Sequence, residues 1–191
     1  LSLHDALPIS YGTLTNMREK DGAIIVPTGM EADRIFCHAH TVDCTGEEAF
    51  DDVKLHKQYC TLTVVLTGGV YWKPYYLRVL SGWVGCDRYS FSAVEGRFDC
   101  PMTQTGTDTY TIRIPRQGDD GLRLEMYGLT TYGTMDDYVE SFDIGRIIAA
   151  NGFDWSDVDL ADVSVTIDYA KTEYTVSILP WQGGLSGEIV I

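Results

Sequence analysis

The chain has 191 residues, of which 45% are hydrophobic and 12% aromatic, a composition typical of folded rather than disordered proteins. Its formal net charge of −14 repels phosphate backbones, so we expect no nucleic-acid partner. No apolar run approaches the ~20 residues that a helix needs to cross a bilayer.

The first ten residues resemble a translated sequencing adapter. One frame of a short-read adapter, CTT TCC CTA CAC GAC GCT CTT CCG ATC T, encodes Leu1 through Ile9, and its last base opens a codon compatible with Ser10. The alternative is an ordinary amphiphilic N-terminus. On the adapter interpretation we expect residues 1–10 to be disordered or loosely attached, and any native signal sequence to be missing upstream of Tyr11.

Residues 11–53 contain two or three short apolar runs, too few for a complete sandwich. We interpret them as the C-terminal remnant of an earlier β domain that ends in the acidic segment 46–52. Such a remnant would lack its native covering, which makes it a possible subunit-docking surface. The candidate docking residues are Ile24, Ile25, Ile35 and Phe36.

The same region holds a possible zinc-ligand set. Cys37, His38, His40 and Cys44 place four soft or borderline ligands within eight residues. Neighbouring residues of a strand point to opposite faces, however, and no second ligand pair follows. We therefore predict no metal site and no cofactor. The five cysteines include no CxxC pair, so their spacing leaves the disulfide state open.

Alternation of apolar and polar residues dominates the chain from residue 54 onward. The first run places Cys60, Leu62, Val64 and Leu66 on one face of a strand. Further runs follow at residues 75–79, 110–114, 122–126, 163–169 and 174–178, and we expect a last strand at 187–191. Residues 170–173 have the length of a hairpin connector. Many short strands separated by turns predict an antiparallel sandwich over residues 54–191.

Four aromatic residues gather beside a glycine pair and a proline, namely Tyr71, Trp72, Tyr75 and Tyr76. Exposed aromatic rings in a loop stack on sugar rings or on a partner protein. The alternative is that alternate members enter the core. We keep the four as candidate glycan or partner contacts.

One helix is predicted after residue 142. Asp143 is a suitable N-cap, the isoleucines of 144–148 form an apolar stripe, and Asn151-Gly152 supplies a C-terminal stop. About two turns of helix need packing against a sheet to be stable.

Four aspartates follow the helix: Asp154, Asp157, Asp159 and Asp162. The glycine and terminal glutamate of a calcium-binding EF-hand loop are missing, so a solvated acidic connector is the better interpretation. No nucleophile elbow or phosphate-binding loop occurs, and no motif pairs His38, His40 or His56 with a nucleophile. We therefore predict that the protein is not an enzyme.

Three stretches resemble Bacteroidales fimbrillin-type proteins, particularly their accessory and anchor subunits. Residues 55–64 are similar to the first strand of the C-terminal domain in that family. Residues 110–117 and 122–125 resemble its mid-domain hairpin, and residues 142–168 resemble its closing helix and strands. Together these stretches span most of residues 50–191.

The resemblance implies two transthyretin-like β-sandwich domains, export as a lipoprotein and assembly into surface fimbriae by strand addition between subunits. This chain departs from the family by lacking most of the first domain and the lipid-bearing cysteine, so membrane attachment would run through an anchor outside this sequence. The expected fold is an all-β chain, an antiparallel transthyretin-like sandwich over 54–191 with one short helix, plus the remnant at 11–53.

The expected function is that of a non-catalytic fimbrial accessory or anchor subunit at the cell surface, outer membrane or fimbrium. The alternative is a carbohydrate-binding module of a cell-surface glycan-utilisation system, with the four aromatic residues as its glycan contacts. An acidic, aromatic, all-β chain without catalytic motifs suits either role, and a fold alone does not choose between them.

Overall fold

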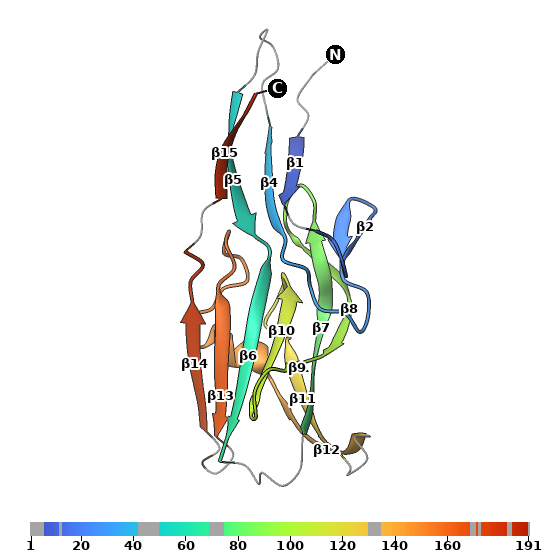
Figure 1. Ribbon diagram of the computed structural model, residues 1–191, viewed down its shortest axis with the longest axis vertical. Coiled ribbons are helices and arrows are strands. Elements are labelled where there is room, and N and C mark those ends of the chain that lie inside the picture. Colours follow the sequence, from blue (N-terminus) through green and yellow to red (C-terminus); the bar gives the residue numbers. More distant parts are fainter. Residues whose placement is uncertain are drawn as a thin grey trace.

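Among the residues that the computed structural model describes, fifteen strands pair into three sheets, and one short helix lies between two of these strands in the sequence (Figure 1). The structure describes residues 6–11, 13–41, 50–68, 75–129, 135–168, 171, 173–182 and 185–190. For residues 6–11, 40–41, 50–51, 135–139 and 185–190 it describes the backbone alone. No described helix has the length and apolar character needed to cross a bilayer.

The first layer of the sandwich is a five-stranded sheet in the order β14-β13-β6-β10-β9. Its strands are β6 (Tyr59–Thr67), β9 (Thr103–Gln104), β10 (Thr109–Pro115), β13 (Asp162–Asp168) and β14 (Glu173–Leu179). The predicted hairpin is confirmed, because β13 and β14 pair antiparallel from Asp162↔Leu179 to Asp168↔Glu173. One pairing differs from the antiparallel expectation, since β13 runs parallel to β6.

The second layer is a six-stranded sheet built around one long strand. Its members are β2 (Arg18–Lys20), β3 (Ala23–Ile25), β7 (Tyr75–Asp87), β8 (Ala93–Pro101), β11 (Arg123–Leu129) and β12 (Met135–Phe142). The order is β12-β11-β7-β3-β2, and β8 also pairs with β7. β11 pairs with residues 75–80 of β7, and β3 pairs with residues 85–87. The length of β7 therefore leaves room for both partners.

The core lies between these two layers, and the alternation in each strand selects its members. Cys60, Leu62 and Val64 on β6 are at most 1% exposed, as predicted from their spacing. Val79 and Leu124 reach them from the facing sheet and are fully buried. Burying one such side chain contributes about 1.5–3 kcal/mol, which makes this layer contact the main source of stability. An all-β sandwich is the fold of the chain.

The third sheet extends beyond the sandwich, toward the top of Figure 1. Its order is β1-β4-β5-β15, with β1 (Ala6–Tyr11), β4 (Phe36–Thr41), β5 (Phe50–Lys57) and β15 (Leu185–Val190). β5 is followed by β6 after the single residue Gln58. At the junction, the ring of Phe36 lies 5.8 Å from that of Tyr59 and 5.4 Å from that of Trp181.

This pairing differs from the expected division at residue 53. The β2–β3 hairpin joins the sandwich, whereas the last strand, β15, leaves it to pair with β5. Ile24 and Ile35 are 3% and 1% exposed and belong to the shared core, so their predicted lack of covering is wrong. The reason is that β7 extends beyond the residues that pair with β11, and this extension pairs with β3. The pairing places the segment over the core. The origin of residues 11–53 in a preceding domain stays a prediction.

The segment resembling an adapter also differs from expectation. Residues 6–11 form β1, which pairs antiparallel with β4 from Ala6↔Thr41 to Tyr11↔Phe36. An unpaired strand edge can pair with an extended segment of almost any sequence, because main-chain hydrogen bonds do not depend on which side chains the segment has. Pairing of this kind therefore does not require a sequence fitted to the core.

Helix α1 (Ile144–Ala149) follows β12 and precedes β13. Asp143 occupies the N-cap position but makes no side-chain capping bond, which corrects the predicted role of its carboxylate. The helix packs tightly instead: a Cβ on Gly145 would lie 2.1 Å from the Asp120 carbonyl oxygen. The segment that contains α1 joins the two sheets, and parallel strands require such a crossover rather than a tight turn. The chain leaves β6, passes through the facing sheet and returns to the first sheet through this segment, so β13 can run parallel to β6.

Candidate functional site

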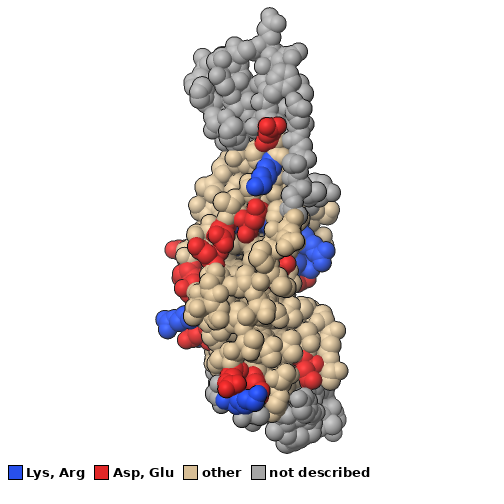
Figure 2. Space-filling view, turned by 90° about the vertical axis from the view of Figure 1, so that its left-hand side faces the viewer, with Lys and Arg blue, Asp and Glu red and all other residues tan. Residues whose placement is uncertain are grey.

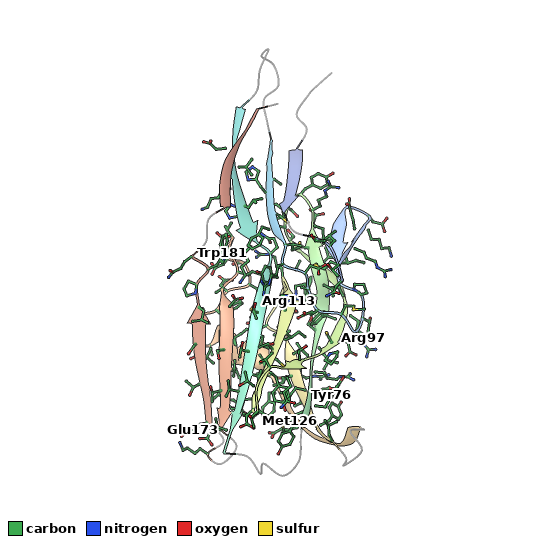
Figure 3. The ribbon with its side chains drawn as sticks, in the orientation of Figure 1. Tyr76, Arg97, Arg113, Met126, Glu173 and Trp181 are labelled. Atoms are coloured by element: carbon green, nitrogen blue, oxygen red, sulfur yellow. The ribbon has the colours of Figure 1, made fainter. Side chains whose placement is uncertain are left out.

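The structure separates the two described members of the predicted aromatic site. Tyr71 and Trp72 lie outside the described residues. Tyr75 packs against the core, and its carbonyl oxygen accepts a hydrogen bond from the Tyr110 hydroxyl at 3.3 Å. Tyr76, labelled in Figure 3, takes the opposite face of β7 and contacts Tyr127 with 6.2 Å between ring centroids. Successive residues of a strand point to opposite faces, so these two cannot form one patch.

Ion pairs border Tyr76 on the outer face of β7, β8 and β11. Arg78 lies 3.2 Å from Asp99 and 3.3 Å from Glu125. The Tyr127 hydroxyl donates to Glu125 at 2.8 Å. Partial burial raises the pKa of Tyr76, so the phenol stays neutral at physiological pH. The surroundings of this aromatic residue are therefore a cross-strand charge network, in which the carboxylates already bind arginine.

The outer edge of β14, which pairs with no other strand among the described residues, is a more distinctive feature than the aromatic residues. β14 ends the sheet order, and the chain carries no charged residue from Tyr174 through Gln182. Thr175 and Ser177 are exposed, and Leu179 is 57% exposed. Natural edge strands usually carry lysine, proline or a bulge that blocks pairing with another chain. None of these interrupts β14 before Pro180.

The inner face of β14 continues the core and is only half covered. Val176 and Ile178 lie opposite Val165 and Val163, which are 0% and 1% exposed. Both β14 side chains pack against the core, yet each stays partly open to solvent. An additional strand beside β14 would cover them.

Figure 2 faces this side of the molecule and shows charged side chains above and below an uncharged stretch. Figure 3 marks the lower end of the edge with Glu173 and the region beyond its upper end with Trp181. The 9-residue stretch 174–182 that lacks charge lies between Glu173 and the following glycine pair. An uncharged edge strand with an apolar, half-covered inner face is the kind of surface that another strand covers.

A second feature is a pocket of about 600 Å³ formed by three connecting segments. These are the β7–β8 turn, the β10–β11 loop and the segment that follows α1. The Asp87 carboxylate organises the first of them by accepting hydrogen bonds from the backbone N–H groups of Tyr89 and Ser90 at 2.9 and 2.8 Å. These bonds lower the pKa of Asp87. Phe91 follows with a φ of 58°, a conformation that bulky residues rarely adopt and that tertiary packing must enforce.

The floor of this pocket contains a buried guanidinium. Arg116 is 6% exposed and donates to Gln58 Oε1 at 2.9 Å, to the Trp155 carbonyl at 2.5 Å and to the Val158 carbonyl at 3.2 Å. Burial lowers the pKa of Arg116, but a guanidinium keeps its charge because the unperturbed value is very high. These bonds connect β10 with the segment after α1, so Arg116 holds the two together.

The four aspartates after the helix divide into two pairs, which corrects the prediction of a solvated connector. Asp159 accepts from the Lys57 backbone at 2.9 Å and contacts His56 at 3.2 Å. Asp162 lies 2.5 Å from Lys57 Nζ. Asp154 and Asp157, by contrast, are exposed at the mouth of the pocket.

Sequence analysis did not single out Lys57, although the spacing of Lys57 along its strand indicated burial. Its side chain is 1% exposed, and its Nζ lies 4.6 Å from the centroid of the Tyr59 ring. Lys57 is in phase with Val53 and Leu55, both of which are buried. A lysine in phase with an apolar face predicts burial with a carboxylate partner, because an unpaired buried charge is costly.

The described part of the suggested zinc-ligand set does not form a site. Cys37 is buried at 1% exposure, whereas His38 Nδ1 lies 3.2 Å from the Lys54 carbonyl oxygen. The side chain of His40 and all of Cys44 lie outside the described structure. Across the described residues, no three His, Cys, Asp or Glu side chains come together as metal ligands would.

Solved structures that are similar to this chain have low sequence identity to it. The fimbrial anchor protein Mfa2 from Porphyromonas gingivalis is similar with a TM-score of 0.50 at 10% identity, over 94% of this chain and 71% of that protein. A candidate adhesin from Bacteroides ovatus gives 0.47 at 7%, over 86% and 63%. A candidate cell adhesion protein from the same species gives 0.40 at 14%, over 95% and 70%. No protein-family model and no curated protein matches the sequence.

Proposed function

We propose that this chain is a non-catalytic subunit of a surface fimbria or related adhesive structure, and that it joins partner subunits by strand addition at β14. The observation that carries the proposal is the uncharged edge of β14 with its half-covered inner face. The fold shared with a fimbrial anchor protein is consistent with this role. The cell surface or the fimbrium is the location that the proposal requires.

The physical basis of the association is main-chain pairing combined with burial of apolar side chains. An edge strand presents alternate N–H and C=O groups that have no partner in the sheet. An added strand would pair with them, while its inward side chains cover Val176 and Ile178. Main-chain bonds then supply affinity, and alternate side-chain positions supply specificity. The partner strand is therefore expected to be apolar at every second residue.

A charged residue on the inner face of the edge tests this proposal. The variant Val176→Lys places an ammonium where the partner strand would bury its side chains. Met30→Lys is the matched control, because Met30 is 48% exposed and follows Gly29, whose backbone N–H donates to Asp99 of β8 in the other sheet. Light scattering across a concentration series should show association of the wild type and of Met30→Lys, but a monomer for Val176→Lys.

Hydrogen exchange identifies the strand that pairs. At concentrations where the protein associates, the alternate amides of β14 that point away from β13 should gain protection that they lack in dilute solution. A wild-type protein that stays monomeric at high concentration, with these outward-pointing amides unprotected throughout, would remove the support for strand addition at this edge.

For the alternative function, carbohydrate binding, one described residue remains a candidate glycan contact. Tyr76 lies on the outer face of β7 beside Tyr127, where an aromatic pair could present a sugar-stacking surface. Glycan-array binding by the intact protein that is lost in Tyr76→Ala would favour this role over assembly at β14.

A further inference from the structure

The outer face of β7 has a tryptophan, Trp83, that belongs to neither the core nor the edge of β14. We infer that Trp83 and the hollow beside it at Gly82 bind a sugar ring of an uncharged oligosaccharide. Figure 3 labels Arg97, which lines this hollow, on the right-hand side of the molecule, far from Glu173 at the start of β14. The inference therefore does not depend on strand addition at β14.

Two observations place the indole of Trp83 on the outer face of the sheet. The next residue, Val84, packs against the core, and successive residues of a strand point to opposite faces. Trp83 also pairs with Glu95 of β8, and Glu95 is exposed. Directly opposed residues of an antiparallel pair have their side chains on the same face, so Trp83 faces outward with Glu95.

The backbone around Trp83 is irregular, and its contacts fix the indole in one orientation. The register of the β7–β8 pair shifts between Ser81 and Trp83 and again between Trp83 and Gly85, and such bulges redirect a side chain. The Ser81 hydroxyl donates to the Trp83 carbonyl at 3.1 Å and accepts from the Trp83 N–H at 3.3 Å. A Cβ on Gly118 would lie 2.5 Å from two carbons of the ring. The indole therefore packs on the β10–β11 loop and is positioned before any ligand binds.

The lack of a side chain at Gly82 opens the surface beside the indole. Gly82 is exposed in the middle of β7, and a Cβ there would meet nothing within 4 Å. Two adjoining hollows of about 560 and 460 Å³ share Ser81, Gly82 and Arg97 in their lining, and Trp83 lines the smaller one. A glycine inside a strand often marks a place where a ligand approaches the backbone closely.

The polar groups beside Trp83 match uncharged hydroxyl groups rather than a ligand of one charge. Arg97 is 73% exposed and donates one N–H to Asp99 at 2.7 Å, which leaves other guanidinium N–H groups as donors. Glu95 and Asp119 are exposed and add carboxylate acceptors. A sugar hydroxyl both donates and accepts, so it pairs with either kind of group. An anion would meet the two carboxylates, and a cation would meet the guanidinium.

The indole and the charge of the protein identify the ligand class. One face of a pyranose ring consists of C–H groups, which pack on an aromatic face while the hydroxyls reach polar side chains at the rim. Ligand pockets typically have about 300–1,000 Å³, and each hollow falls in this range. The net charge of −14 repels an anionic glycan at long range but does not repel a neutral one.

The test uses an array of neutral gluco-, manno-, galacto- and xylo-oligosaccharides, with sialylated and uronic-acid glycans on the same array. The neutral oligosaccharide that binds the full chain best is then titrated against it. The NMR signal of the Trp83 indole N–H, assigned with Trp83→Phe, reports the site. We expect saturable binding that shifts this signal. Trp83→Ala should weaken the binding about ten-fold, the scale for losing one aromatic stacking contact.

Gly82 provides a variant that blocks the hollow without disturbing the packing. Gly82→Gln places a side chain in the space that both hollows share, and it should weaken binding at least as much as Trp83→Ala. Thr175→Gln is the matched control, because it places the same side chain at an exposed strand position of the other sheet. Urea unfolding shows whether each variant folds. If Gly82→Gln does not fold, Arg97→Gln tests the rim and should also weaken binding.

Several results would overturn the inference. They are the absence of binding by every neutral oligosaccharide, an unmoved Trp83 signal when one binds, and unchanged affinity in folded Gly82→Gln. Loss of binding in Tyr76→Ala but not in Gly82→Gln would assign the sugar to the other aromatic pair. Tighter binding of the acidic glycans would overturn the assignment to an uncharged ligand. Val176→Lys should bind the oligosaccharide as the wild type does, so failure here and failure of strand addition at β14 are distinguishable.

Discussion

The ring of Tyr174 on β14 packs edge-on against the ring of Phe142 on β12, with 6.1 Å between centroids and 76° between planes. β14 is the last strand of the five-stranded sheet and β12 is the last strand of the six-stranded sheet. The contact therefore joins the two layers where both sheets end, next to the edge that we propose for strand addition.

Tyr174→Ala should destabilise the fold by about 1 kcal/mol, since an aromatic pair contributes about 0.5–1.5 kcal/mol beyond its buried area. The loss is limited because Tyr174 is 42% exposed. Urea unfolding measures the change. Tyr89→Ala is the control, because Tyr89 is 51% exposed and lies on the β7–β8 turn. Equal stability of the two variants would show that the contact contributes nothing.

The Lys57–Asp162 pair should respond unequally to removal of either partner. Asp162→Asn leaves a buried ammonium without its carboxylate and should cost about 1–3 kcal/mol, below the full cost for a buried pair because Asp162 is 36% exposed. Lys57→Met removes the buried charge while keeping its volume, so it should be much closer to neutral. Chemical denaturation at neutral pH compares the two. A larger loss for Lys57→Met would contradict this account.

Gly85→Ala should disrupt the pairing of β3 with β7. A Cβ at Gly85 would lie 1.9 Å from the Ile24 carbonyl oxygen, whereas one at Gly82 on the same strand would meet nothing within 4 Å. We expect a loss of about 2 kcal/mol or more for Gly85→Ala, with faster hydrogen exchange in β2 and β3, and little change for Gly82→Ala. Undisturbed exchange in Gly85→Ala would show that these strands do not depend on β7.

The Asp87 carboxylate should make stability depend on pH. Its pKa is lowered in the folded state by hydrogen bonds from Ser90 and Tyr89. A depressed folded-state pKa stabilises the protein above the unfolded value, about 3.9, and this contribution is lost as pH falls through the folded pKa. The stability difference between wild type and Asp87→Asn should therefore shrink in acid. Unfolding curves from pH 7 down to about pH 2.5 test this, and a constant difference would contradict it.

The buried thiols should resist alkylation in the native protein. Burial raises the pKa of Cys86 and Cys100 to about 12 and raises that of Cys60 as well, so the reactive thiolate is scarce at pH 8. All three are at most 3% exposed. Iodoacetamide labelling with mass spectrometry should modify them only after denaturation. Rapid native labelling at any of the three would show that the site opens readily.

The sequence by itself determined where most of the sandwich strands lie and which of their residues face the core. The spacing of Leu62, Val64 and Leu66 predicted their burial, because strand side chains alternate between faces with a period of two. The absence of charged residues from 174–182 can likewise be read directly from the sequence. The resemblance to fimbrillin-type proteins pointed to an all-β sandwich, which the structure has.

Tertiary structure alone decided which strands pair. The alternation of residues in a strand does not specify which strand lies beside it. The sequence therefore did not predict three pairings: β3 with β7, β13 parallel to β6, and β15 with β5 outside the sandwich. The same holds for the pocket. Arg116 and Trp155 are 39 residues apart, and only folding brings the guanidinium to the Trp155 carbonyl. Sites built from distant loops depend on the packing of the whole chain, which local patterns do not encode.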